Sequence, residues 1–172
     1  GPGVSGVDRL AGIAANLPPT VRERFDIVSF DPRGVGVTTP IDCTETLDPV
    51  FDTSFSPATG AERTALVDSL RVVATACEQR NGALLERVAS VDSARDIDAL
   101  RLALGEKQLS FLGFSYGTYL GTLYAAMFPE HVRALVLDGA IDPTIDAAAS
   151  TLLQVRGFEQ SLSEFLDDCA AR

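Results

Sequence analysis

The stretch that decides the fold is 109–128, which reads LSFLGFSYGTYLGTLYAAMF. It opens with a short apolar run that is typical of a buried strand. Its middle is a G-x-S-x-G pentapeptide, Gly113-Phe114-Ser115-Tyr116-Gly117. The residues that follow predict a buried helix that stops before Pro129. A strand, a tight turn at a serine and a helix are together typical of a turn that presents a nucleophilic serine.

The spacing of this motif has a steric reason. The turn forces Ser115 into a strained backbone conformation, and side chains two residues away on either side would clash there. We therefore expect Gly113 and Gly117 to shape the turn. The strain pushes the serine hydroxyl out at the carboxyl end of the sheet, within reach of a base. The next backbone N–H, from Tyr116, then points at a developing oxyanion, so Tyr116 is a predicted oxyanion donor.

The composition is that of an acidic globular chain. Its 172 residues are 46% hydrophobic and 22% charged, with a formal net charge of −10. This length suffices for one hydrophobic core. The negative charge disfavours nucleic acid and anionic lipid as partners. Because no apolar run approaches the length of a membrane span, no membrane span is expected.

Apolar runs and helical patterns alternate along the chain. Because strands that alternate with helices favour a parallel, doubly wound sheet, we expect an α/β fold with ligands at the carboxyl ends of the strands. A Thr59–Glu62 capping box predicts where the first helix begins. Besides the strand–turn–helix of 109–128, we expect strands at 25–31 and 133–137 and helices at 59–79, 93–104 and 147–172.

Two other kinds of site are disfavoured by the motifs. The glycines of 34–36 lack the third glycine of a dinucleotide-binding loop, since Thr39 stands at its position. The aspartates Asp138, Asp142 and Asp146 are four residues apart but lack the intervening ligands and glycine of a calcium loop. We expect these aspartates to form turns and helix caps, and we expect neither a metal nor a cofactor.

Four motifs follow one another in order: GPGVSG at 1–6, DPRGVG at 31–36, GFSYGT at 113–118 and VLDGAIDP at 136–143. This series resembles the α/β-hydrolases of the secreted tripeptidyl aminopeptidase and proline iminopeptidase group, over nearly the whole chain. The resemblance implies an α/β-hydrolase fold with a mostly parallel sheet. It also implies that residues 1–143 form part of the core and that 144–172 begin a helical lid.

The same resemblance implies an activity. Such enzymes are serine exopeptidases that cut peptides near free amino termini through an acyl-enzyme, without a cofactor. Their glycine–proline–glycine loop supplies a second oxyanion donor, which corresponds to Gly1 in this chain, with Gly3 shaping the same turn. They are exported proteins, so the resemblance implies a secreted or cell-envelope location.

A serine nucleophile needs a base and an acid that orients the base. The chain has one histidine, His131. It follows a helix of ten to twelve residues, which places it roughly 15–18 Å from Ser115 at the opposite end of the sheet. We therefore expect His131 to be a surface residue. Asp138 is interpreted as a loop former, and Asp31 and Arg33 as a loop-fixing ion pair.

The resemblance also predicts that the chain is a part of a longer protein. In this fold the third strand lies between the fourth and the fifth, and the glycine–proline–glycine loop follows it. The chain starts inside that loop, so we expect the third strand, the base and the acid to lie elsewhere in a protein two to three times longer. By itself the chain is expected to be inactive, with its sheet and triad completed by the remainder of the protein.

The three cysteines leave two readings open. A Cys43–Cys77 disulfide would close a loop of about 35 residues, contribute roughly 3–4 kcal/mol and fit an exported protein. Cys169 would then be a free thiol or have a partner outside these residues. The alternative is three reduced, buried thiols in a cytosolic protein.

Two other functions also remain open. The same scaffold carries esterases and lactonases, because a fold does not fix the substrate. A degenerate hydrolase retained as a binding module is the non-catalytic alternative.

Overall fold

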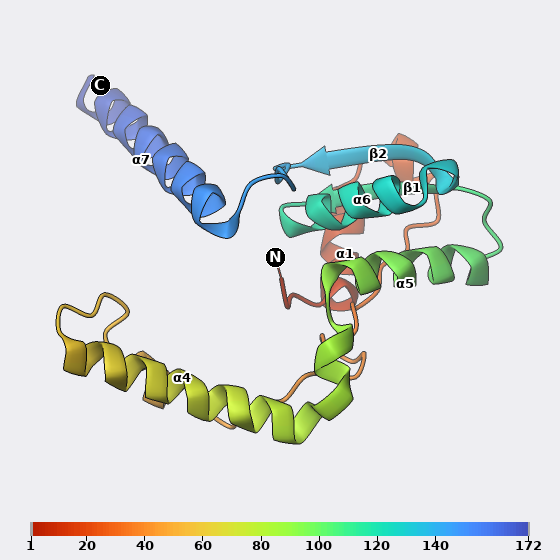
Figure 1. Cartoon of the computed structure of the whole chain (residues 1–172). Helices are drawn as coiled ribbons and strands as arrows, with labels where there is room; N and C mark the ends of the chain where they lie inside the picture. The colour runs from red at the N-terminus through yellow and green to blue at the C-terminus, as the bar shows by residue number, and fades with distance from the viewer. Residues whose placement is uncertain (1, 172) are drawn as a thin grey trace. The chain divides into compact units, whose positions relative to one another are not determined.

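The computed structural model describes residues 2–171. Contacts between these residues divide them into two compact units, 2–96 and 97–171. The boundary falls inside helix α5, Ser90–Ala103. Figure 1 shows the helices and strands in chain order.

The first unit is helical. Its first helix begins after Ser5, whose side chain accepts a hydrogen bond from the backbone N–H of Asp8 and so caps the helix. This helix was not expected from the sequence. Before α5 the unit contains α1 (Gly6–Asn16), α2 (Pro19–Arg22), α3 (Asp48–Phe51), α4 (Gly60–Asn81) and the 3₁₀ helix η1 (Gly82–Arg87).

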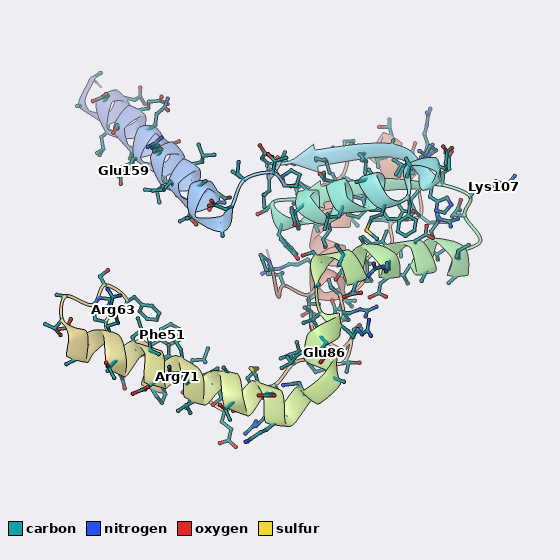
Figure 2. All side chains as sticks on the ribbon, viewed as in Figure 1. Phe51, Arg63, Arg71, Glu86, Lys107 and Glu159 are labelled. Atoms are coloured by element: carbon teal, nitrogen blue, oxygen red, sulfur yellow. A yellow bond between two sulfur atoms is a disulfide. The ribbon has the colours of Figure 1, made fainter. Side chains whose placement is uncertain are left out.

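The predicted helix at 59–79 is confirmed as α4. The hydroxyl of Thr59 accepts a hydrogen bond from the N–H of Glu62 at 3.2 Å. The carboxylate of Glu62 accepts in return from the N–H of Ala58 at 2.7 Å, one residue before the position expected for a capping box. Figure 2 shows Phe51 of α3 beside α4.

A disulfide joins Cys43 to Cys77, which lies in α4. Next to it, the guanidinium of Arg80 contacts the carboxylate of Asp42 at 2.9 Å. The side-chain amide of Asn81 donates to the carbonyl oxygen of Asp42 at 3.0 Å. The loop around Cys43 is therefore fixed to the last turns of α4.

The strand expected at 25–31 is wrong, since these residues form neither a strand nor a helix. A strand exists only where its backbone groups bond to a neighbouring strand. Among residues 2–171 the only strands that pair are those of the second unit. Sequence pattern alone does not reveal whether such a neighbour is present.

The second unit contains two parallel strands joined by a helix. Its elements after α5 are β1 (Leu109–Phe114), α6 (Tyr116–Met127), the 3₁₀ helix η2 (Pro129–His131), β2 (Val132–Asp138) and α7 (Ala147–Ala171). The register pairs the first residue of β1 with the first of β2, and the last with the last. Helix α6 lies along this strand pair and contacts both strands (Figure 1). The strands expected at 109–114 and 133–137 and the helix expected at 93–104 are confirmed. The helix expected at 147–172 is confirmed over 147–171, and residue 172 lies outside the described residues.

Two strands with a helical crossover are the repeating unit of a parallel α/β sheet. The predicted fold class is confirmed, and the sheet is incomplete within the described residues. Apolar side chains of the strands are exposed, with Leu112 at 38%, Phe114 at 44% and Val136 at 59%. A parallel sheet is ordinarily covered on both faces.

Helix α7 carries no buried side chain. In Figure 2, side chains project from it on all sides around Glu159. Its sole cysteine, Cys169, is exposed and not in a disulfide. Within residues 2–171, no helix combines the length and the apolar character that crossing a membrane requires.

Candidate active site

Ser115 lies at the turn between β1 and α6, with φ +51° and ψ −119°. This is a left-handed conformation for a residue with a side chain, shared among residues 2–171 only by Thr39. Such a conformation costs about 1–3 kcal/mol and persists only where the surrounding structure fixes it. Ser115 is exposed. The strained, exposed serine that the motif predicts is therefore present.

Hydrogen bonds on both sides fix this conformation. The N–H of Ser115 donates to the carbonyl oxygen of Asp138, the last residue of β2, at 2.9 Å. The carbonyl oxygen of Ser115 accepts from the N–H of Thr118 at 2.9 Å and from the Thr118 hydroxyl at 2.6 Å. The same hydroxyl accepts from the N–H of Ile141 at 2.9 Å. The turn is thereby bonded to β2, to α6 and to the loop after β2.

The two glycines of the motif differ in what they accommodate. A Cβ at Gly113 would lie 2.6 Å from the carbonyl oxygen of Gly117 and 2.9 Å from the backbone nitrogen of Thr118. A Cβ at Gly117 would meet no atom within 4 Å. The expected clash is therefore present at Gly113 and absent at Gly117 within the described residues, because only the Cβ direction of Gly113 points into the turn.

Tyr116 begins α6 directly after the serine, so its N–H lies at the positive end of the helix dipole. Its ring stacks on that of Tyr119, with centroids 5.9 Å apart. The oxyanion role of its N–H stays a prediction. Gly3 has a φ of +74°, as a turn-shaping glycine requires. Gly1, the other predicted donor, lies outside the described residues.

Asp31 is buried and its carboxylate fixes two loops of the first unit. Oδ1 accepts from the hydroxyl of Ser5 at 2.7 Å and from the N–H of Val7 at 3.1 Å, and Oδ2 accepts from the N–H of Val37 at 3.0 Å. These bonds, the one from Ser5 most of all, lower the pKa of Asp31. The carboxylate thus joins the start of α1 to the glycine-rich loop after Arg33.

The expected ion pair between Asp31 and Arg33 is wrong in its partner. Arg33 binds the carboxylate of Asp96 in α5 through two nitrogens, with Nε 2.7 Å from Oδ2. It also donates to the carbonyl oxygen of Arg87 at 3.1 Å. Asp31 accepts hydrogen bonds from three other donors, and the carboxylate of Asp96 makes a bidentate contact that matches the guanidinium. Arg33 still fixes the loop, as predicted.

His131 lies in η2, before the first residue of β2, whereas Ser115 follows the last residue of β1. The strands are parallel, and their first and last residues pair with each other. The two residues therefore lie at opposite ends of the strands, about 20 Å apart at about 3.3 Å per residue. The Nδ1 of His131 is 2.7 Å from Oδ1 of Asp98, and its ring stacks on Phe128. The structure thus does not bring His131 to the serine.

Asp98 is the centre of a polar cluster near the amino-terminal ends of the two strands, where His131 lies. Its Oδ1 accepts from Nε of Arg101 at 2.8 Å, from the hydroxyl of Tyr124 at 3.1 Å and from His131. The hydrogen bond from Arg101 is the main cause that lowers the pKa of Asp98 to about 2, against the effect of burial. Burial raises the pKa of Tyr124. Arg101 also donates to the carbonyl oxygen of Glu106 at 2.7 Å.

The aspartates after β2 form turns and caps. Asp142 accepts from the N–H and the hydroxyl of Thr144 at 2.8 and 2.6 Å, which lowers the pKa of Asp142. Asp146 accepts from the N–H of Ala149 at 2.8 Å, in the first turn of α7. In the part of the chain that the structure describes, no three His, Cys, Asp or Glu side chains are placed to hold a metal ion.

Sequence reasoning missed two groups of residues. One is Thr118, whose position directly after the G-x-S-x-G motif was visible in the sequence but carried no expected role. The other is the cluster around Asp98. In the sequence, only the three-residue spacing from Asp98 to Arg101 on a predicted helix indicated an ion pair there.

Comparison with known proteins gives one family. The family model described as alpha/beta hydrolase fold matches residues 1–172. The chain is 39% identical over 178 positions to "Serine protease Hip1" of Mycobacterium tuberculosis H37Rv, covering 99% of this chain and 34% of the relative. It is 40% identical over 151 positions to "Tripeptidyl aminopeptidase" of Streptomyces lividans, covering 85% of this chain and 28% of the relative.

A third relative carries a different activity in its name. "Carboxylesterase B" of Mycobacterium tuberculosis CDC 1551 is 40% identical over 180 positions, covering 99% of this chain and 34% of that protein. The chain thus spans about a third of the length of the curated relatives it matches. The names are those of a serine protease, an aminopeptidase and a carboxylesterase.

Proposed function

Because this chain belongs to the α/β-hydrolase family, we propose that it is the nucleophile-bearing part of a serine peptidase that releases short peptides from free amino termini. The observation that carries the proposal is the strained, exposed Ser115 at the β1–α6 turn. The relatives named serine protease and tripeptidyl aminopeptidase support the choice of a peptide substrate.

In the proposed reaction, the Ser115 hydroxyl attacks the carbonyl carbon of the scissile peptide bond and gives its proton to a histidine base. The negative charge then rests on the carbonyl oxygen, which accepts hydrogen bonds from the N–H groups of Tyr116 and Gly1. Collapse of this intermediate breaks the C–N bond and leaves an acyl-enzyme on Ser115, while the base returns the proton to the amine. Water then hydrolyses the ester.

We place the base and its acid partner outside the described residues. His131 is hydrogen-bonded to Asp98 at the end of the strands opposite the serine, so it is not in a position to act as the base. The relatives are about three times longer than this chain. In this proposal the remainder of the protein completes the sheet, covers its apolar faces and supplies the triad, and 144–172 begin a lid. Residues 1–172 alone would then be inactive.

A second candidate is an esterase on the same scaffold, which the 40% identical carboxylesterase favours. The two candidates differ in how they treat a free α-amino group. A peptidase that acts at amino termini needs an acidic site for the α-ammonium, and an esterase does not. We also propose export to the cell surface or beyond, because the Cys43–Cys77 disulfide fits an oxidising compartment.

The test uses the full-length natural protein with tripeptide p-nitroanilides whose amino terminus is free or acetylated, and with p-nitrophenyl esters. We expect hydrolysis of the free tripeptide substrate, little of the acetylated one, and labelling of Ser115 by a fluorophosphonate. Ser115→Ala should lower kcat/KM by about 10⁴-fold or more. His131→Asn is the matched control and should retain activity.

Each outcome separates the candidates. Turnover of esters alone would select the esterase. An unlabelled Ser115 with no turnover of any substrate would favour a non-catalytic binding module. Loss of activity in His131→Asn without loss of folded protein would show that the base is misassigned.

A further inference from the structure

Thr118 is fully buried, and its hydroxyl makes two hydrogen bonds that serve the serine turn. The hydroxyl donates to the carbonyl oxygen of Ser115 at 2.6 Å and accepts from the N–H of Ile141 at 2.9 Å. The Thr118 N–H donates to the same carbonyl at 2.9 Å. The Ser115 carbonyl is therefore held by two donors from one residue.

This carbonyl belongs to the peptide group that joins Ser115 to Tyr116. A peptide group is planar, so the direction of its carbonyl oxygen fixes the direction of its N–H. That N–H is the oxyanion donor proposed for Tyr116. If the carbonyl of Ser115 rotates, the Tyr116 N–H must rotate with it and turn away from the position of the oxyanion.

The serine turn needs such support because the conformation of Ser115 is strained, with φ +51° and ψ −119°. The loop after β2 supplies the second anchor. Its residue Gly139 lies close to the turn: a Cβ added at Gly139 would lie 3.8 Å from the Ser115 nitrogen. Through Ile141, the same loop bonds to the Thr118 hydroxyl, which thereby ties the strained turn to β2.

Threonine hydroxyls in helices commonly bond a carbonyl one turn earlier, and Thr122 shows that ordinary arrangement. Its hydroxyl donates to the carbonyl oxygen of Thr118 at 2.9 Å, within α6. Thr118 differs in three respects: it is fully buried, its acceptor is the strained serine, and it receives a hydrogen bond from another segment of the chain.

We propose that Thr118 is a positioning residue of the oxyanion hole: its hydroxyl holds the peptide plane between Ser115 and Tyr116, and so aims the Tyr116 N–H. This inference rests on the proposed function, because it assigns Thr118 a role at the serine through which the hydrolase would act. Thr118 itself touches no reacting atom.

The test compares four variants of the full-length protein: Thr118→Val and Thr118→Ala, which lack the hydroxyl, Thr118→Ser, which keeps it, and Thr122→Val as the matched control. Kinetics are normalised to the sites titrated with a fluorophosphonate, so that unfolded molecules do not count. Two inhibitors are measured on each variant: a tripeptide boronate, which needs the oxyanion donors, and a tripeptide analogue with a methylene group in place of the scissile carbonyl, which does not.

We expect Thr118→Val and Thr118→Ala to lower kcat about 10- to 100-fold, with KM within about twofold, since loss of one oxyanion donor costs about 10²–10³-fold and a misdirected donor less. The Ki of the boronate should rise by the same factor as kcat falls, and the Ki of the methylene analogue should stay constant. Thr118→Ser and Thr122→Val should retain kcat within about threefold.

An unchanged kcat per titrated site in either variant that lacks the hydroxyl would overturn the proposal, as would an equal loss in Thr122→Val. The alanine variant removes atoms without adding bulk, so the inference remains testable if the valine variant does not fold. Retention of activity in Ser115→Ala would instead refute the proposed function, whatever Thr118 does.

Discussion

Replacing Gly113 by alanine tests whether the turn geometry at Ser115 controls catalysis. The added Cβ would lie 2.6 Å from the Gly117 carbonyl oxygen, whereas ordinary contact begins at 3.4 Å. The turn would have to open by the difference, about 0.8 Å, and the atom that must yield is backbone. Because a displacement of about 1 Å at a reacting group can cost 10²-fold in rate, we expect kcat/KM to fall about 100-fold in Gly113→Ala.

The assay is hydrolysis of the free tripeptide p-nitroanilide by the full-length protein, with far-ultraviolet circular dichroism to confirm folding. Gly117→Ala is the matched control. Its Cβ would meet no described atom within 4 Å, and alanine is favoured over glycine in a helix by about 1 kcal/mol. We expect Gly117→Ala to retain kcat/KM within about threefold.

Wild-type kinetics in Gly113→Ala would refute the reasoning, since the steric overlap would then have no consequence at the serine. Equal losses in the two variants would also contradict it. That result would mean that the pentapeptide pattern, rather than the contact seen at Gly113, describes the constraint.

Two further predictions concern stability. The pKa of Asp98 lies near 2 in the folded chain, below its ordinary value of 3.8, so the unfolded state binds more protons in that range. The stabilisation by Asp98 is therefore complete above about pH 4 and is lost as pH falls toward 2. The stability difference between wild type and Asp98→Asn, measured by urea unfolding from pH 5 to 2, should shrink over that interval; a constant difference would contradict the assignment. Replacing Cys43 and Cys77 by serine should lower the unfolding free energy by about 3–4 kcal/mol, because the disulfide no longer closes the loop between these cysteines, which are 34 residues apart. An unchanged urea midpoint would contradict this prediction.

The sequence predicts well what short-range stereochemistry decides. The strand–serine–helix turn follows from the glycine spacing and the apolar runs on either side, and Ser115 has the strained conformation expected. The start of α4 follows from the Thr59 cap, and the alternation of strands with helices gives the α/β class. Each of these depends on residues within a few positions of one another.

Sequence does not reveal what depends on a partner distant in the chain. The segment 25–31 has the pattern of a strand but pairs with no strand among residues 2–171. Arg33 pairs with an aspartate 63 residues away rather than with Asp31. Both cases are decided by which backbone or carboxylate lies nearby after folding.

The candidate site divides in the same way. The sequence by itself determined the strained serine turn and the helix that follows it, because the steric rules of the turn act between adjacent peptide groups. Only the tertiary structure decided that His131 hydrogen-bonds to Asp98 at the end of the strands opposite the serine. It also decided that a side chain would clash at Gly113 but not, among the described residues, at Gly117, and that Thr118 hydrogen-bonds to the loop after β2. The physical reason is that hydrogen bonds and steric contacts depend on distances in space, which the order of residues fixes only over a few positions.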